Sequence, residues 1–229
     1  MASLLPDYIC AMRKFEDTYR HKGLRKKLVE IVKGKGITDE RVLAAIENIP
    51  RHFFLDSAFD EVAYEDRAFP ITAGQTISQP YTVAYQTQLL EVKPFTKVLE
   101  IGTGSAYQAS VLAEIGAQVF TIERQKKLWE QNKTFPYLKK YPNIKFFYGD
   151  GYEGLPTYAP FDRVLITAAA PEIPSKLIHQ LKPGGMMVIP VGSGDLQTMK
   201  RLTKQADGSV VEENFDLFSF VPMLGGKNE

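Results

Sequence analysis

The chain has 229 residues, with 28 lysines and arginines against 27 aspartates and glutamates and a net charge of +1. This length is enough for one α/β domain with a buried core and an appended segment. The balance of charge excludes strong electrostatic attraction to nucleic acid or to an anionic membrane, so we expect neither as a partner.

Cysteine use and the first residues of the chain bear on where the protein works. Cys10 is the only cysteine, so no intrachain disulfide can form and a reducing compartment is favoured. Residues 1–14 lack a positively charged start before an apolar stretch and contain no run long enough to cross a bilayer. We therefore expect a soluble, cytoplasmic protein, and we expect it to be a monomer.

The first predicted elements are helices. Residues 13–32 are charged and helix-favouring but contain Gly23, which predicts one or two surface helices. After a glycine-containing break, Thr38 is a candidate N-cap for a further helix that Pro50 ends. Residues 51–70 are rich in aromatic residues and turn formers without a sustained period, which is typical of irregular binding loops.

From residue 97 onward, short apolar runs alternate with helical stretches, the pattern of βαβ units and a mainly parallel sheet. Strands are predicted at 97–101, 118–122, 144–148, 163–167 and 186–190, and helices at 106–115, 125–140 and 173–181. Two further strand-like runs, 197–204 and 214–221, predict a C-terminal antiparallel hairpin. The predicted fold class is therefore α/β, with a doubly wound, mostly parallel seven-stranded sheet and N-terminal helices.

The first βα turn, residues 100–104, is the candidate cofactor site. Glycines 102 and 104 would let the backbone approach a ligand closely. A dinucleotide fingerprint needs glycine at position 107, which is Tyr107, whereas an S-adenosylmethionine (SAM) turn needs glycine at 106, where Ala106 is nearly as small. The turn thus favours SAM over a nicotinamide, although two glycines alone also occur in purely structural turns.

Three acidic residues follow or precede turns at the same edge of the sheet. Glu123 ends the second strand, where its carboxylate can accept from both ribose hydroxyls. Asp150, followed by Gly151, is suited to the adenine amino group, and Glu100 could accept from the ammonium group of the cofactor. Each has a structural alternative, such as a solvated helix start for Glu123 or a simple turn for Asp150. Their order along the chain nevertheless favours a cofactor site.

With these residues in place, the chain resembles the SAM-dependent methyltransferases that have a seven-stranded sheet with an antiparallel last strand. The resemblance implies SAM as cofactor and S-adenosylhomocysteine (SAH) as product. It disfavours a nicotinamide dehydrogenase, because Tyr107 occupies the third glycine position and a second mononucleotide-binding half is lacking.

Upstream of the sheet, residues 73–80 read Ala-Gly-Gln-Thr-Ile-Ser-Gln-Pro and precede a helical stretch that runs to Leu90. Ser78 is a good N-cap candidate for this helix, with Pro80 in its first turn. The same helix start offers unpaired backbone donors to an anionic ligand. From the residues alone, both uses of Ser78 stay open.

Several motifs, in their order, resemble the protein-L-isoaspartate (D-aspartate) O-methyltransferase family. They are residues 36–46, 49–51, 74–80, 98–104 and 220–225. The resemblance covers residues 36–226, which leaves 1–35 as an N-terminal helical extension before a methyltransferase domain at 36–229, whose residues 36–94 carry the active-site loops. Ala106 in place of glycine and Met223 in place of leucine are mild departures.

The resemblance implies roles for individual residues. Ser78 would be the catalytic residue and contact the substrate, and Val221, Pro222 and Leu224 would line the substrate groove. The cofactor-binding residues would be Gln75, Thr76, Ile77, Glu100, Gly102, Thr103, Gly104, Glu123, Asp150 and Gly151. The acceptor would be the free α-carboxylate of L-isoaspartyl residues in damaged proteins and peptides, whose methyl ester initiates repair through a succinimide. No metal site is expected.

This chemistry requires no general base, because an α-carboxyl group has a pKa of about 3.3–3.7 and is ionised at neutral pH. Accordingly, none of the three histidines, His21, His52 and His179, lies in a candidate loop, and we interpret them as structural. Two alternatives remain. One is a SAM-dependent methyltransferase with a different small-molecule or protein acceptor, and the other is a non-catalytic SAM-fold binding protein.

Overall fold

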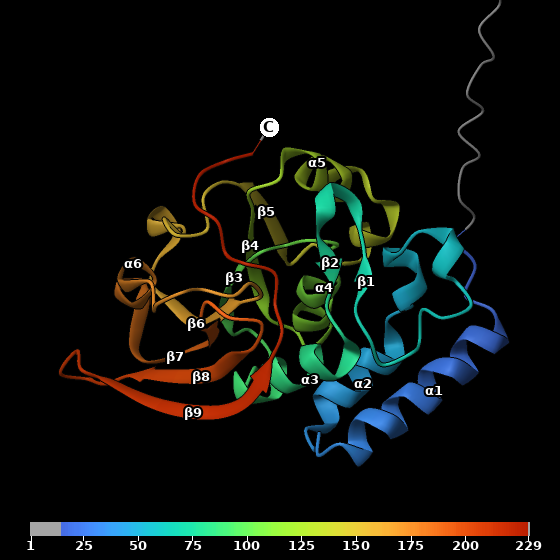
Figure 1. Ribbon diagram of the computed structural model, residues 1–229, viewed down its shortest axis with the longest axis horizontal. Helices are drawn as coiled ribbons and strands as arrows, with labels where there is room; N and C mark the ends of the chain where they lie inside the picture. The colour runs from blue at the N-terminus through green and yellow to red at the C-terminus, as the bar shows by residue number, and fades with distance from the viewer. Residues whose placement is uncertain (1–14, 229) are drawn as a thin grey trace, which may run out of the picture.

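The computed structural model describes residues 15–228, and every structural statement below refers to these residues. Figure 1 shows a central sheet, with the blue and teal N-terminal elements on its right and the red C-terminal hairpin at the lower left. None of the helices within 15–228 is both long and apolar enough to cross a membrane.

The sheet has seven strands in the order β5-β4-β3-β6-β7-β8-β9. They are β3 (Lys97–Ile101), β4 (Gln118–Glu123), β5 (Ile144–Tyr148), β6 (Phe161–Ile166), β7 (Leu181–Val191), β8 (Gln197–Lys204) and β9 (Val210–Phe218). Strands β3 to β7 pair in parallel, and β8 and β9 add an antiparallel hairpin at one edge. The predicted fold class is confirmed. The strand order reverses beside β3, so the carboxyl end of β3 is where a ligand crevice is expected.

Six α-helices accompany the sheet. They are α1 (Tyr19–Gly34), α2 (Glu40–Asn48), α3 (Pro80–Leu89), α4 (Tyr107–Glu114), α5 (Lys126–Thr134) and α6 (Ser175–His179). Short 3-10 turns are η1 (Arg51–Phe54), η2 (Ser57–Phe59), η3 (Thr72–Gly74), η4 (Pro136–Lys140) and η5 (Pro156–Tyr158). Two short strands, β1 (Phe69–Pro70) and β2 (Thr76–Ile77), pair with each other outside the main sheet.

The core is divided between the two faces of the sheet, because successive side chains of a strand point to opposite faces. Val98 of β3 and Leu165 of β6 pack with the apolar residues of α1, α2 and α4. Their neighbours Leu99 and Val164 belong to the other cluster, with residues of α6. Since both faces are covered, the central strands consist almost entirely of buried residues.

The N-terminal helix follows one of the two expected arrangements, because α1 runs through Gly23 without a break. Leu28, Val29 and Val32 are buried, and their packing offsets the roughly 1 kcal/mol that a helical glycine costs. The end of a later helix differs from prediction. The helix predicted at 125–140 stops at Thr134, since Pro136 lacks a backbone N–H and restricts the residue before it.

Two further expectations were wrong in detail. The N-cap of α2 is Asp39, not Thr38, because the Asp39 carboxylate accepts from the backbone N–H of Arg41. Strand β9 spans Val210–Phe218 and not 214–221, so the residues after Phe218 leave the sheet and are available for another contact.

Candidate active site

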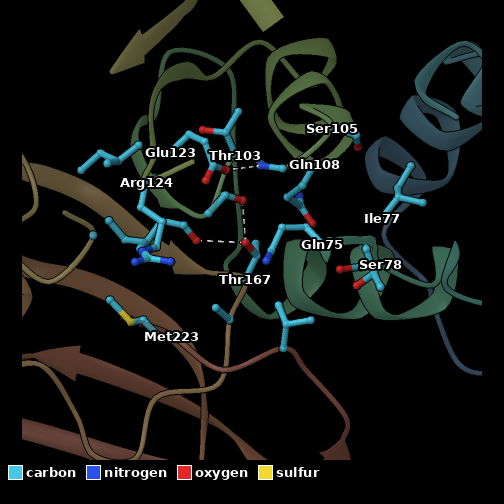
Figure 2. Close-up of a pocket in the computed structure, with 18 of the residues that line it drawn as sticks. Gln75, Ile77, Ser78, Thr103, Ser105, Gln108, Glu123, Arg124, Thr167 and Met223 are labelled. Atoms are coloured by element: carbon cyan, nitrogen blue, oxygen red, sulfur yellow. Dashed lines mark hydrogen bonds between the residues drawn. The ribbon is translucent and has the colours of Figure 1, made fainter. Parts of the chain in front are cut away.

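A pocket opens at the carboxyl ends of β3 and β4 and is enclosed by segments that lie far apart in the chain (Figure 2). One side is the glycine turn after β3, and another is the stretch of residues 75–78, which we call the Ser78 loop. A third side is formed by residues 221–224. The predicted site residues that line it are Gln75, Thr76, Ile77, Ser78, Gly102, Thr103, Gly104, Glu123, Gly151, Val221, Pro222 and Leu224.

The glycine turn is shaped by a close approach of Thr167. Gly102 has φ +96°, and a Cβ atom there would lie 2.6 Å from Thr167 Oγ1. That hydroxyl lies 2.9 Å from the carbonyl oxygen of Ile101 and 2.8 Å from that of Gly102, and its single proton can be donated to one of them. Only glycine satisfies both the backbone conformation and the available space.

The backbone conformation of residue 106 explains why a SAM turn has glycine at this position. Ala106 is the N-cap of α4, fully buried, with φ +66° and ψ +14°. This is the left-handed region, which costs a residue with a Cβ atom about 1–2 kcal/mol. The chain thus keeps the turn geometry with alanine, at the expense of local strain.

Glu123 lies beside the glycine turn and is hydrogen-bonded to it. Its Oε2 accepts from the backbone N–H of Gly104 at 2.8 Å, and its Oε1 accepts from that of Gln125 at 2.8 Å. Burial raises the pKa of Glu123, although these backbone donors oppose the rise. A carboxylate can accept about four hydrogen bonds, so acceptor capacity remains for a ligand in the pocket.

Glu100 lies in β3, directly before the glycine turn. Its side chain is fully buried, both carboxyl oxygens have no hydrogen-bond partner within residues 15–228, and it does not line the pocket. Burial, with a contribution from the charge of Glu123, raises the pKa of Glu100 to about 8. Glu100 is therefore mainly protonated at neutral pH, and its contact with a cofactor ammonium group stays a prediction.

Asp150 is also outside the pocket lining, although its neighbour Gly151 is part of it. The Asp150 carboxylate accepts from the backbone N–H of Tyr152 at 2.9 Å and from that of Gly226 at 2.6 Å. A Cβ atom at Gly151 would lie 2.4 Å from Ile101 Cγ2, so a larger residue could not occupy this position unchanged.

Residues 221–228, which we call the C-terminal segment, are held beside the pocket by hydrogen bonds. Val221 accepts from the N–H of Ala169, and Met223 donates its own N–H to the Ala169 carbonyl at 2.7 Å. Arg124, which lines the pocket, donates to the carbonyl oxygens of Gly225 and Gly226 at 3.2 Å each. The segment therefore forms a fixed side of the pocket and not a loose tail.

Ser78 does not cap helix α3, so that interpretation was wrong. The N-cap position is Gln79, and the N–H of Tyr81 is taken by Asp66 Oδ1 at 2.8 Å. The other oxygen of Asp66 is held by Lys35 and by the Gln79 amide. Because Asp66 caps the helix, the Ser78 hydroxyl is left for a ligand, and Ser78 lines the pocket.

The pocket also contains polar residues that the sequence did not indicate, among them Ser105, Gln108, Arg124 and Thr167. Gln108 donates from Nε2 to the Thr87 hydroxyl at 2.9 Å, while its Oε1 is buried without a partner in the described chain. Nothing in a helical pattern distinguishes such a residue from a core glutamine. That Gln108 lines the pocket becomes visible only in the fold, where its amide bonds to Thr87 of α3.

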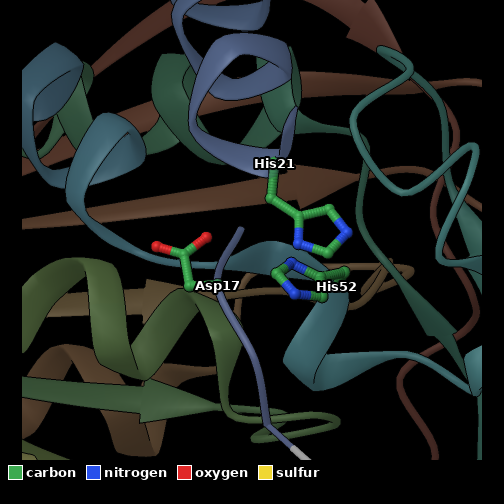
Figure 3. A group of neighbouring side chains, drawn as sticks. All are labelled: Asp17, His21 and His52. Carbon is green, nitrogen blue, oxygen red and sulfur yellow. The ribbon is translucent and has the colours of Figure 1, made fainter. Parts of the chain in front are cut away.

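Two of the histidines meet an aspartate outside this pocket. The side chains of Asp17, His21 and His52 are neighbours (Figure 3), and one possible ligand atom of each lies within 4.8 Å of the others. The carboxylate of Asp17, however, is paired with the Arg25 guanidinium at 2.7 and 2.8 Å. The ring nitrogens of His52 lie 2.6 Å from the Tyr64 hydroxyl and 3.2 Å from the carbonyl of Glu16. These contacts connect the residues before α1 to the rest of the fold.

Comparison with known proteins places this geometry in context. The family model described as protein-L-isoaspartate(D-aspartate) O-methyltransferase matches residues 23–228. The protein-L-isoaspartate O-methyltransferase of Christiangramia forsetii is 54% identical over 213 residues, which are 93% of this chain and all of that relative. The enzyme of the same name from Cytophaga hutchinsonii is 57% identical over 210 residues, 92% of this chain and 95% of its own.

Two solved structures are similar as well. One, a protein-L-isoaspartate O-methyltransferase, has a TM-score of 0.80 and 29% identity, covering 88% of this chain and 66% of that chain. The other comes from Plasmodium falciparum, in complex with S-adenosyl-L-homocysteine, and is described as a putative enzyme of the same kind. Its TM-score is 0.75 and its identity 25%, covering 87% of this chain and 98% of that chain.

Proposed function

The chain belongs to the protein-L-isoaspartate(D-aspartate) O-methyltransferase family, and we propose how its pocket serves that activity. It is a SAM-dependent methyltransferase that acts on L-isoaspartyl residues in proteins. The observation that carries the proposal is a single pocket in which the glycine turn and Glu123 are enclosed together with the Ser78 loop and residues 221–224. A different acceptor or a purely binding role is not favoured.

The residues of the turn fit the cofactor. Gly102, Thr103 and Gly104 bring the backbone to the pocket in the turn that only glycine at 102 allows, and Glu123 has acceptor capacity for ribose hydroxyls. Asp150 would accept from the adenine amino group with its remaining lone pairs, next to Gly151. When bound, SAM supplies a methyl group on a positively charged sulfur.

The Ser78 loop would hold the acceptor. The Ser78 hydroxyl does not cap α3, so it would donate to the α-carboxylate of the isoaspartyl residue and orient one carboxylate oxygen towards the methyl group. The carboxylate is already ionised at neutral pH, so no base has to remove a proton. Ser78 therefore acts by positioning, which is where most of the acceleration of such a transfer originates.

Two segments would exclude water from the pocket. Gln75, Thr76 and Ile77 cover one side of the pocket, and Val221, Pro222 and Leu224 cover the side where the peptide would lie. The reaction joins a negative and a positive charge, and such charges attract more strongly where water is excluded. The backbone amide nitrogen would then attack the methyl ester and release methanol to give a succinimide, which water reopens in part to normal aspartate.

We also propose a monomeric, cytoplasmic enzyme without nucleic-acid, membrane or metal partners. This is supported by the net charge of +1 and the single cysteine. The division into a helical extension at 1–35 and a methyltransferase domain at 36–229 stays a proposal too, with the family match beginning earlier, inside α1.

The experiment offers labelled SAM to the protein with two matched peptides, one containing isoaspartate and the other normal aspartate. We expect base-labile methyl ester on the isoaspartyl peptide alone. Equal labelling of both peptides, or label that resists base, would contradict the proposed acceptor.

A further inference from the structure

A fully buried arginine lies directly behind the Ser78 loop. Arg51, in η1, has no exposed surface. It donates from Nε to the Ala63 carbonyl at 3.1 Å and from Nη2 to the Ser78 carbonyl at 2.9 Å. Its guanidinium carbon also lies 4.9 Å from the centre of the Tyr107 ring. Arg51 therefore contacts two residues that line the pocket, Ser78 and Tyr107.

The charge of Arg51 is not neutralised by an ion pair. Within residues 15–228 no carboxylate oxygen lies within 4.0 Å of its nitrogens, and Nη1 is buried without a partner. Asp66 is the acidic side chain whose charge it feels most, but that carboxylate is paired with Lys35. Burial lowers the pKa of Arg51 to about 10, so the group remains a cation at neutral pH.

An unpaired buried charge is costly, because neither water nor a counter-ion stabilises it. The acceptor of the proposed reaction brings a carboxylate to Ser78, the residue whose carbonyl Arg51 holds. Arg124 is a second cation at the pocket, but it acts on Glu123, whereas Arg51 is bonded to Ser78 itself. The donor nitrogens of a helix start carry only partial charges.

We propose that Arg51 is a positioning residue that fixes the Ser78 backbone and whose positive charge makes the pocket select an anionic acceptor. The inference rests on the proposed function of the same pocket. The charge attracts the acceptor most strongly before transfer, when the carboxylate is fully negative. Removing it should therefore raise KM more than it lowers kcat.

The test compares two ligands in the presence of saturating SAH, so that no transfer occurs. One is an isoaspartyl peptide with its free α-carboxylate, and the other is the same peptide with this group as a carboxamide. Calorimetry gives the ratio of their dissociation constants, which measures selection for charge. We expect Arg51→Gln to reduce this ratio about tenfold or more, and Arg51→Lys to retain most of it while lowering kcat.

Arg163→Gln is the matched control. Arg163 donates from Nε to the Leu90 carbonyl at 2.6 Å and forms no ion pair in the described chain, but it lies towards the amino end of β6, away from the pocket. The control changes the net charge equally and should leave the ratio unchanged. Thermal unfolding with and without SAH establishes that each variant is folded.

A ratio that stays the same in Arg51→Gln, with both peptides weakened alike, would overturn the inference and leave Arg51 a purely structural residue. If Arg51→Gln does not fold, the inference is tested on the unmodified protein by varying the salt concentration. The ratio of the two dissociation constants should change less than about twofold between 0.05 and 0.5 M salt, because a buried charge is poorly screened. A steep fall of this ratio with salt would overturn the inference. Absence of ester formation by the unmodified protein would count against the proposed function instead.

Discussion

The Glu123 carboxylate accepts the backbone N–H of Gly104 at 2.8 Å, so the proposed ribose acceptor and the glycine turn are hydrogen-bonded to each other. Its second oxygen holds the N–H of Gln125, at the start of α5. The side chain expected either to bind the ribose or to be a solvated charge at a helix start is thus buried and fixes the two turns that surround it.

Glu123→Gln should weaken SAM binding about 10- to 100-fold. An amide has one oxygen, so it cannot accept from Gly104 and Gln125 at the same time and also serve a ribose, and hydrogen bonds to a charged group contribute about 1.5–3 kcal/mol. Calorimetry measures the affinity. Glu153→Gln, which changes an exposed glutamate paired with Lys176, is the control. Equal affinities in the two variants would rule out the ribose contact.

Ser78→Ala should leave SAM affinity within about twofold and lower kcat/KM for an isoaspartyl peptide about 10- to 100-fold, the loss of one hydrogen bond to a carboxylate. Stability should hardly change, because Asp66 and not Ser78 caps α3. Ser105→Ala, which also changes a hydroxyl of the pocket, is the control. Unchanged turnover in Ser78→Ala would show that another group orients the acceptor.

Gly102→Ala should destabilise the protein by about 2–4 kcal/mol and weaken SAM binding. Two causes act together, a φ of +96° and a Cβ atom 2.6 Å from Thr167 Oγ1. Adding Thr167→Ala removes the close contact but not the backbone strain, so the double variant should recover part of the loss. Urea unfolding of the single and double variants measures this coupling. Strictly additive effects would mean that the hydroxyl does not limit residue 102.

Glu100→Gln should change how stability depends on pH. The folded-state pKa of Glu100 is raised from 4.5 to about 8, so its protonated form stabilises the fold below pH 4.5 and this contribution is lost as pH rises to 8. The variant lacks this loss, and its advantage in unfolding free energy over the unmodified protein should grow from pH 5 to pH 8 and then level off.

Urea unfolding at pH 5, 7 and 9 tests the effect of Glu100. The control, Glu153→Gln, changes an exposed glutamate, so comparison with it separates the effect of burial from the loss of one negative charge. Parallel curves for Glu100→Gln and this control would show that the buried carboxyl is not protonated in the folded state.

Ala106→Gly should alter the unfolding free energy by less than about 1 kcal/mol, because three contributions nearly cancel. Glycine removes left-handed strain of about 1–2 kcal/mol, loses about 0.8 kcal/mol of methyl burial, and adds about 0.4–1 kcal/mol of entropy cost. Ala106→Val, by contrast, should destabilise strongly, since a branched residue tolerates φ +66° poorly. Thermal unfolding of both variants decides whether residue 106 is strained.

The main sheet could be predicted from local pattern. Strands β3, β5 and β8 begin and end where the apolar and turn residues indicate, because each is a short run bounded by residues that cannot continue it. The two-residue strands β1 and β2 could not be found this way, since their pairing depends on the chain returning at η3.

The roles of the site residues were harder to predict where a residue distant in sequence makes the contact that the local sequence assigns to another. Ser78 looks like a helix cap locally, and only the fold brings Asp66 to that helix start. Thr167 and Arg124 likewise gain their roles from Gly102 and from the C-terminal segment, which are distant in sequence. Charge burial at Arg51 has no local signal at all.

The position of the C-terminal segment has a consequence for the order in which the protein is made. The glycine turn and the Ser78 loop leave the ribosome long before residues 221–228, which complete the pocket and hold Arg124 and Asp150. A nascent chain can therefore pair β3 with β4 and still lack a closed cofactor site. Cofactor binding should follow the release of residues 221–228, so nascent chains that lack them should bind SAM weakly.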